Sequence, residues 1–396
     1  MGHFFPKKSR AYLDWASAAP VHPKAQKAFG DALGVFGNPS SPHEEGRAAK
    51  TLLEDSRMRI ARLAGVKQRA VIFTSGATEA NALAIRGRIE RCRKNGMTYG
   101  NMHLLYLPTM HASVLGTVHE LASLGVQVEP IALSGSAIDT ERFATQLRPE
   151  TVLVCVDAVC GETGARFDTL RLRRAIDAAH NGSAVTHAVL HVDASQLPLV
   201  EPIDYTRLGA DLISLDAQKV GGVRGIGALL VPNARHITAI TQGGGQEEGL
   251  RPGTEPVALA AAFANALEEC AKGCGTFAEG AREARADLIA RVTTTTPSAL
   301  LNEGSRQAPH ILNLSFPGLD TDYAVALLDT AGFAVSTRSA CETDSEDGSK
   351  AVVAYTGDEA RAKATLRISW GPETARKDLV RFAAALSEVT SFLEAD

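Results

Sequence analysis

The sequence lacks the features that mark nucleic-acid-binding, membrane-spanning and secreted proteins. Its 396 residues include 41 Lys and Arg against 45 Asp and Glu, a net charge of −4, so no basic surface for nucleic acid is indicated. No apolar run reaches the roughly 18 residues that a membrane-spanning helix needs, and the apolar part of the N-terminus is too short for a signal peptide. We therefore expect a chain that contacts neither nucleic acid nor membrane.

Cysteine is also scarce, and its six positions show no pattern. They form neither a disulfide framework nor a paired C-x-x-C zinc motif, which favours the reducing cytoplasm; they are Cys92, Cys155, Cys160, Cys270, Cys274 and Cys341. Cys270 and Cys274 lie four residues apart on a predicted helix without further ligands, so we expect no metal site. The sequence has no G-x-G-x-x-G motif and no Walker lysine, which disfavours nucleotides.

Short apolar runs alternate with amphipathic segments through most of the chain. Residues 70–76, 102–108, 151–159, 188–194 and 211–217 are typical of buried strands, and residues 43–65, 77–89 and 169–181 of helices. This alternation predicts an α/β fold: a large three-layer α/β domain with a mainly parallel sheet. The regular alternation of predicted strands and helices ends after a long helix near residues 255–273. We predict a large domain over 16–264 and a smaller α+β domain from 1–15 and 265–396.

Residues capable of chemistry follow several of these strands, where ligands collect in open α/β sheets. Gly76, Ala77 and Thr78 turn from a strand into a helix, which can form a cup for an anion; simple N-capping is the alternative. Asp193 ends an apolar run, and burial of its carboxylate requires a cation nearby unless it only caps the next helix. Gln196 follows three residues later.

Two further strand ends carry Lys219 and His111. Lys219 follows the apolar run 211–215 and precedes several glycines, a setting that suits a lysine reacting with a bound carbonyl compound. His111 follows another strand, although a lone histidine is more often structural. An anion cup, a carboxylate, a lysine and a histidine are together the parts that hold pyridoxal 5'-phosphate (PLP). The cup binds phosphate, the carboxylate keeps the pyridine nitrogen protonated, the lysine forms an imine and the histidine stacks.

The residues and the order of several motifs resemble those of the cysteine desulfurases, which are class V aminotransferase-like enzymes of PLP fold type I. These motifs span nearly the whole chain: "YLDWASAAPVHP", "FGNPSSPHEEGRAAK", "FTSGATEAN", "HVDASQ", "GIGALLV", "LRPGTEPV", "STRSAC" and "LRISWG". The resemblance implies that the α/β fold is the PLP-dependent transferase fold type I.

The resemblance also implies a role for each matching residue. Lys219 would bind PLP covalently and Asp193 would pair with its ring nitrogen, with Gln196 on the ring hydroxyl and His111 on the ring face. Gly76, Ala77 and Thr78 would bind the phosphate, and Gln218 would also contact the cofactor. Thr254 would reach the phosphate in a neighbouring subunit, which implies a homodimer. Arg367 would clamp the substrate carboxylate, a task for which its guanidinium is suited, and Asn38 would line the substrate side.

The resemblance assigns Cys341 as the residue that forms a persulfide. L-cysteine would be converted to alanine, and Cys341 would pass the sulfur to an acceptor protein, for iron–sulfur clusters or thiolated nucleotides. Its polar surroundings, residues 341–350, predict a mobile loop. Arg338 would favour the thiolate, whereas the acidic residues between 342 and 347 would oppose it.

Five residues depart from the family pattern. Gln218 replaces a histidine, Ala158 an asparagine, Trp15 a small polar residue and Arg338 a glycine. Asp216 stands where a serine or threonine usually meets the phosphate, and an acid there would repel phosphate unless it points away or is neutralised. These changes leave alternatives open: a selenocysteine lyase, an aminotransferase-like enzyme acting on a small amino acid, or a non-catalytic paralogue that binds a partner.

Overall fold

A seven-stranded sheet forms the centre of the protein in a computed structural model, which describes residues 10–180, 188–337 and 348–395. The strand order is β2-β10-β9-β8-β7-β3-β4, and only β10 runs antiparallel to its neighbours. The strands are β2 (Val71–Thr74), β3 (His103–Tyr106), β4 (Gln127–Pro130), β7 (Thr151–Asp157), β8 (Val189–Asp193), β9 (Leu212–Asp216) and β10 (Gly227–Leu230). Strands β7, β8 and β9 are buried throughout, as their Val, Ile and Leu content requires. The predicted mainly parallel sheet is confirmed.

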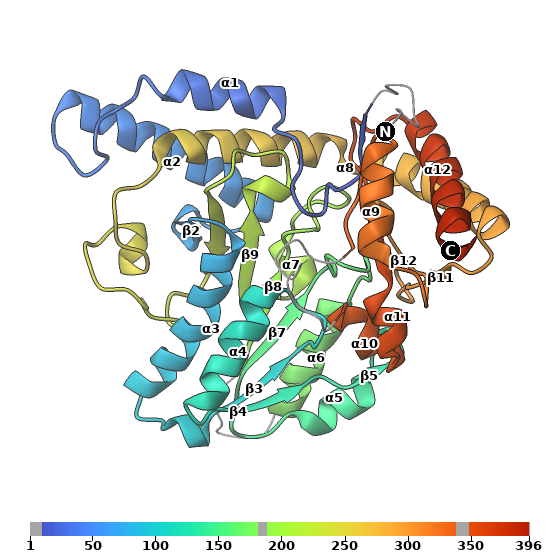
Figure 1. Cartoon of the computed structure of the whole chain (residues 1–396). Helices are drawn as coiled ribbons and strands as arrows, with labels where there is room; N and C mark the ends of the chain where they lie inside the picture. Colours follow the sequence, from blue (N-terminus) through green and yellow to red (C-terminus); the bar gives the residue numbers. More distant parts are fainter. Residues whose placement is uncertain (1–9, 181–187, 338–347, 396) are drawn as a thin grey trace.

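Helices cover both faces of this sheet (Figure 1). The connection from β3 to β4 moves one way along the sheet, whereas those from β7 to β8 and β9 move the other way. Because such crossovers are right-handed, they place α4 (Ala112–Ser123) on one face and α6 (Thr169–His180) and α7 (Tyr205–Leu208) on the other. Helix α3 (Ala77–Lys94) packs beside α4, and α5 (Thr140–Gln146) packs beside α6. The three-layer arrangement follows.

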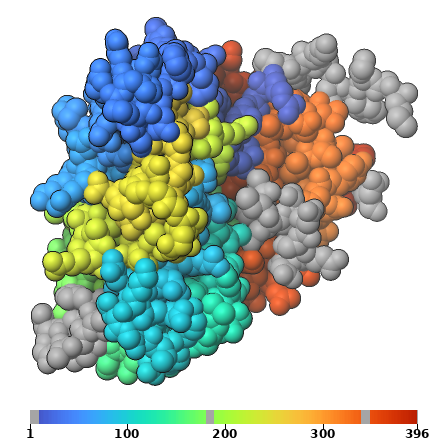
Figure 2. Space-filling model, turned by 90° about the vertical axis from the view of Figure 1, so that its left-hand side faces the viewer, coloured from blue at the N-terminus to red at the C-terminus, as the bar shows by residue number. Residues whose placement is uncertain are grey.

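The longest helix, α8 (Val257–Thr295), runs from the large sheet to the C-terminal part of the chain (Figure 1). Helices α1 (Pro23–Ala32) and α2 (Glu44–Ala64) pack along it. Figure 2 shows that the yellow segment before α8 lies on the surface, between the blue α1–α2 region and the cyan helices below. No helix in the described ranges is both long and apolar enough to span a membrane.

A second hydrophobic core lies in the C-terminal part. It surrounds the antiparallel sheet β11-β12-β14, and the N-terminal strand β1 joins it by pairing with β13. The elements are β1 (Ala11–Tyr12), β11 (Leu300–Leu301), β12 (Ile311–Ser315), α9 (Thr321–Thr330), β13 (Phe333–Ala334), α10 (Lys350–Thr356), α11 (Glu359–Lys363), β14 (Thr365–Ser369) and α12 (Arg376–Ala395). A small hairpin, β5 (Leu133–Ser134) and β6 (Ala137–Ile138), completes the fold. The boundary at residue 264 stays a prediction, since α8 continues through it.

Candidate active site

A cavity of about 360 Å³ lies where the carboxyl ends of β3, β7, β8 and β9 meet the start of α3. Strands β3 and β7 are neighbours whose crossovers leave in opposite directions, which is where open α/β sheets bind ligands. Eight of the predicted site residues line this one cavity: Ala77, Thr78, His111, Asp193, Gln196, Gln218, Lys219 and Arg367. These eight residues lie far apart in the sequence, from Ala77 at the start of α3 to Arg367 on β14 of the C-terminal sheet.

Lys219 ends the short 3₁₀ helix η3 (Ala217–Lys219) that follows β9. Its Nζ donates hydrogen bonds of 2.7 Å to the backbone oxygens of Ala16 and Ser17. These carbonyls belong to the "ASAAP" segment, which lines the same cavity. The lysine of the "AQKVGG" segment is therefore directed into the cavity rather than toward bulk solvent.

Asp193 lies at the end of β8 and is 9% exposed. Its Oδ1 accepts the backbone N–H of Ser195 at 3.0 Å, and its Oδ2 accepts the side-chain amide of Asn81 at 2.9 Å. The Asn81 amide also donates to Ser113 Oγ at 3.0 Å, and Ser113 Oγ lies 2.9 Å from His111 Nδ1. A hydrogen-bonded chain therefore joins the carboxylate to the predicted stacking histidine.

The tautomer of His111 follows from its contacts at the start of α4. The backbone N–H of Ser113 donates to His111 Nδ1 at 3.1 Å. Because that nitrogen accepts a backbone hydrogen bond, a neutral ring carries its proton on Nε2. Asn81 and Ser113 were not among the sequence-based candidates. The signal for Asn81 was its place one turn after the "SGAT" cup.

Asp157 is a second buried carboxyl in the cavity, which the sequence analysis also missed. It ends β7 opposite Asp193 in the parallel register and is 5% exposed. Burial, with the nearby charges of Asp193 and Glu162, raises the pKa of Asp157 well above its ordinary value. An aspartate follows the apolar residues of "VCVDA" just as Asp193 does in "LHVDA". This likeness could have indicated Asp157 as a second site residue.

The predicted phosphate cup contains a carboxylate of the chain itself. Asp216 Oδ2 accepts the backbone N–H of Ala77 at 2.9 Å, and Oδ1 accepts that of Gln218 at 3.0 Å. Asp216 is 8% exposed, and burial raises its pKa despite these hydrogen bonds and nearby Lys219. Asp216 therefore does not point away from the cup, which was one of the two conditions for phosphate to bind beside it.

Arg367, on β14, reaches the cavity from the C-terminal sheet and is 3% exposed. Its Nη1 donates to the Gly161 oxygen at 3.0 Å, and its Nη2 donates to Asp14 Oδ1 at 2.9 Å and Ser17 Oγ at 2.5 Å. The buried Nε has no hydrogen-bond partner among the described residues. The guanidinium is thus held in place by three of its five N–H groups, and two remain, one on Nε and one on Nη1. Asp14 and Ser17 were not predicted to hold it.

Other predicted residues lie elsewhere. Asn38 and Thr254 are exposed and do not line the cavity; Asn38 Oδ1 accepts the N–H of Ser40. Gly76 is the N-cap residue of α3 and precedes the lining residues. Cys341, Arg338 and most of the predicted loop 341–350 lie outside the described residues. Within the described ranges, no group of His, Cys, Asp and Glu side chains could hold a metal ion.

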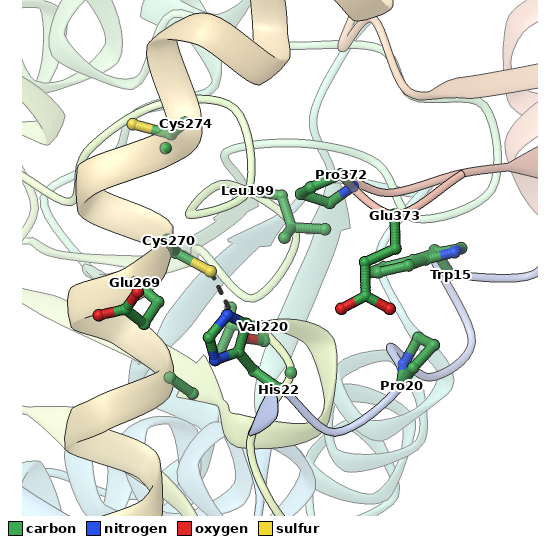
Figure 3. Close-up of a pocket in the computed structure, with 13 residues that line it drawn as sticks. Trp15, Pro20, His22, Leu199, Val220, Glu269, Cys270, Cys274, Pro372 and Glu373 are labelled. Atoms are coloured by element: carbon green, nitrogen blue, oxygen red, sulfur yellow. Dashed lines mark hydrogen bonds between the residues drawn. The ribbon is translucent and has the colours of Figure 1, made fainter. Parts of the chain in front are cut away.

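A second cavity has a volume of about 210 Å³ (Figure 3). Its lining includes Trp15 and Val220, which directly precede Ala16 and directly follow Lys219 of the first cavity. Trp15, the predicted departure from the family pattern, lines it together with Val220, Cys270 and Cys274. Cys270 Sγ donates to the Val220 oxygen at 3.4 Å, and burial raises the pKa of Cys270 to about 12. This thiol is therefore protonated and a poor nucleophile at neutral pH.

The other described cysteines behave in the same way. Burial raises the pKa of Cys160 to about 12 and also raises the pKa values of Cys92, Cys155 and Cys274. All five are free thiols, and four of them are buried. Cys270 and Cys274 lie on α8, which confirms the helix predicted for them.

Comparisons with known proteins identify the family to which the chain belongs. Residues 11–382 match the sequence profile of the aminotransferase class-V family. Cysteine desulfurase IscS 1 of Archaeoglobus fulgidus is 32% identical over 382 residues, which cover 96% of either chain. Cysteine desulfurase IscS of Methylococcus capsulatus is 34% identical over 392 residues, 96% of this chain and 92% of that protein.

Solved structures give the same answer for the fold. A NifS-like protein superposes with a TM-score of 0.88 at 25% identity, over 97% of this chain and 100% of its own. DndA from Streptomyces lividans superposes with a TM-score of 0.74 at 28% identity, over 94% and 100%. The predicted fold type I architecture is thereby confirmed. Because the profile and the relatives span nearly its whole length, the chain belongs to the cysteine desulfurases of the class-V aminotransferase family.

Proposed function

We propose that this chain is a PLP-dependent cysteine desulfurase, which converts L-cysteine to L-alanine and transfers the sulfur to Cys341 as a persulfide. The observation that carries the proposal is that Lys219, Asp193, His111 and Arg367 line one cavity in a chain of this family. The persulfide sulfur would then pass to an acceptor protein in the reducing cytoplasm. That protein would serve iron–sulfur cluster assembly or nucleotide thiolation.

The residues on the ring side of the cavity fit PLP. The Lys219 amine would bind the aldehyde, and the Asp193 carboxylate would hold a proton on the ring nitrogen. Bound PLP supplies a ring that stabilises the negative charge left when the substrate loses its α-proton. Asn81 fixes the orientation of Asp193, and the Nε2–H tautomer of His111 is set by Ser113. The phosphate side fits less simply, because the Ala77 N–H of the cup already donates to Asp216.

Arg367 would anchor the carboxylate of L-cysteine through the two donors that it keeps, while Asp14 and Ser17 hold the guanidinium. The thiolate of Cys341 would then attack the sulfur of the bound cysteine. A sulfur–sulfur bond forms as the carbon–sulfur bond breaks, and the electron pair returns to the substrate carbon, which is protonated to give alanine. The raised pKa values of the five described cysteines disfavour each of them for this step.

We also propose that the enzyme is a homodimer. Thr254, which would serve the partner's phosphate, is exposed and outside the cavity of its own chain. The loop between α1 and α2 exposes 61% of Leu33 and 82% of Phe36, and it lies on the same face as the segment that carries Thr254 (Figures 1 and 2). Exposed apolar side chains of this size favour a protein contact.

The test is a visible spectrum of the purified protein with PLP, before and after cysteine is added, combined with an assay of sulfide release. The wild type should show a visible cofactor band that cysteine changes, and Lys219→Ala should lose the band. Cys341→Ala should keep the band but lose sulfide release. Sulfide release that survives in Cys341→Ala would instead favour a reaction independent of that cysteine. A wild type that stays colourless with PLP would favour a non-catalytic paralogue.

A further inference from the structure

The N-terminus of α3 carries carboxylates at the place where the cofactor's phosphate would bind. Asp216 Oδ2 accepts the Ala77 N–H at 2.9 Å, and Glu79 Oε2 accepts the Ser75 N–H at 2.5 Å. A helix N-terminus attracts negative charge, so these side chains satisfy it without a ligand. Glu79 is also neutralised by Arg251, whose Nε lies 3.0 Å from Glu79 Oε1. Asp216 has no ion pair of 4.0 Å or less among the described residues.

The position of Asp216 is fixed by the sheet. It is the last residue of β9, and its register partner on β10 is Gly227. A Cβ on Gly227 would lie 2.6 Å from the Leu215 oxygen and 2.7 Å from the Gly76 carbonyl carbon, so the cup and the end of β9 are in close contact. A Cβ on Gly76 would lie 3.4 Å from Asp216 Oδ2. A phosphate that uses the Ala77 N–H must therefore come into contact with this carboxyl group.

The charges that face Asp216 do not cancel. Burial raises the pKa of Asp216 most; Lys219, at the end of the short helix η3 that follows Asp216, lowers it, and Asp193 on β8 raises it. Arg224, His111 and Asp157 line the same cavity from other elements. A phosphate dianion would add further negative charge beside a carboxyl group whose burial already favours the neutral form.

We propose that Asp216 takes up a proton from solvent when the cofactor's phosphate binds, and that the neutral carboxyl group then donates a hydrogen bond to a phosphate oxygen. This inference rests on the proposed PLP dependence. It adds that the protein takes up one proton together with the phosphate group of PLP. The hydroxyl group that the family uses at this position is thereby replaced by a carboxylic acid. Affinity for the phosphate should then weaken as pH rises.

The experiment compares PLP with pyridoxal, which has the same ring and aldehyde but no phosphate. Binding of each compound to cofactor-free protein is titrated from mildly acidic to mildly alkaline pH, and the ratio of the two affinities isolates the phosphate. For the wild type this ratio should fall by up to about tenfold per pH unit once free Asp216 is ionised. In Asp216→Asn, which has nearly the same shape and cannot titrate there, the part of the fall that is due to Asp216 should disappear, and PLP should bind more tightly than to the wild type at alkaline pH.

Two controls separate this effect from others. Ionisation of the PLP phosphate itself affects wild type and variant alike and cancels between them. Glu79→Gln removes the neighbouring carboxylate at the same helix end and should keep the wild-type slope. Isothermal titration of PLP in two buffers with different heats of ionisation should show wild type taking up as much as one proton more than Asp216→Asn. If Asp216→Asn does not fold, Asp216→Ser provides the same comparison.

Equal slopes for wild type and Asp216→Asn, or equal proton uptake, would overturn the inference while leaving PLP dependence intact. If neither PLP nor pyridoxal binds to wild type or to either Asp216 variant, both this inference and the proposed function are wrong. A steeper fall of the affinity ratio in the wild type than in Asp216→Asn supports both.

Discussion

Replacing Glu247 by Gln should destabilise the protein by breaking a buried ion pair. Both oxygens of Glu247 bind Arg57, at 2.6 Å and 2.7 Å, and Oε2 also accepts the Phe73 N–H at 2.7 Å. Arg57 and Glu247 are 6% and 5% exposed. A Gln side chain can keep its oxygen at only one of the two positions, so its NH₂ group must face a donor. Arg57 then also loses its buried counter-charge.

The expected loss is about 3 kcal/mol, since removal of one partner from a buried pair costs about 3–5 kcal/mol. The lower end applies because Glu54 Oε1 remains 3.1 Å from Arg57 Nε. Urea unfolding of cofactor-free protein, followed by fluorescence of the buried Trp15 and Trp370, would measure the loss. The pair joins the segment that leads to Thr254 with β2, the strand that leads into the cup.

Asp287→Asn is the matched control. It breaks the ion pair between Asp287 and Arg291, one turn apart on the surface of α8, and should change the free energy of unfolding by less than about 0.5 kcal/mol. A double variant, Arg57→Met with Glu247→Gln, should lose less than the sum of its two single variants, because neither buried charge then remains unpaired. A loss below about 1 kcal/mol for Glu247→Gln alone would show that the pair does not stabilise the fold as argued.

Three further outcomes are expected. Since burial raises the pKa of Asp157, the folded protein keeps a proton that the unfolded chain loses. The free energy of unfolding of the wild type should therefore fall as pH rises above the ordinary carboxyl range. Urea unfolding at several pH values should show a smaller fall for Asp157→Asn. Asn81→Leu should disorient Asp193 and His111 together, so sulfide release should fall far more than in Asn81→Gln, and a similar fall in both would contradict the bridging role. Gly227→Ala should weaken PLP binding by pressing on the Gly76 backbone, whereas Gly30→Ala, whose added methyl meets no atom within 4 Å, should leave binding unchanged.

The sequence predicted the parts of the site that depend on local order along the chain. Lys219, Asp193 and His111 each follow a buried strand, and parallel strands bring their carboxyl ends to one edge, so their meeting could be expected. Contacts between distant segments could not. Ala77 and Asp216 are 139 residues apart, and Arg57 and Glu247 are 190 apart. Hydrophobic periodicity reports which face of an element is buried, but it does not say which side chain of another element lies against it.

One departure from the family pattern, Asp216, adds to the negative charge of the cavity. Four carboxyl groups line it, Asp157, Glu162, Asp193 and Asp216, against three cationic side chains, Lys219, Arg224 and Arg367. Arg367 is already paired with Asp14. A cavity of this composition accepts a cationic ring nitrogen readily and a dianionic phosphate reluctantly, so protonation of its carboxyl groups is the means by which the fold can lower the cost. Burial raises the pKa of Asp157 well above its ordinary value, so this group already favours its protonated form. Burial also raises the pKa of Asp216, which is the group beside the cup that can take up a proton. Under the proposed PLP dependence, retention of the cofactor's phosphate is therefore the property that Asp216 makes dependent on pH.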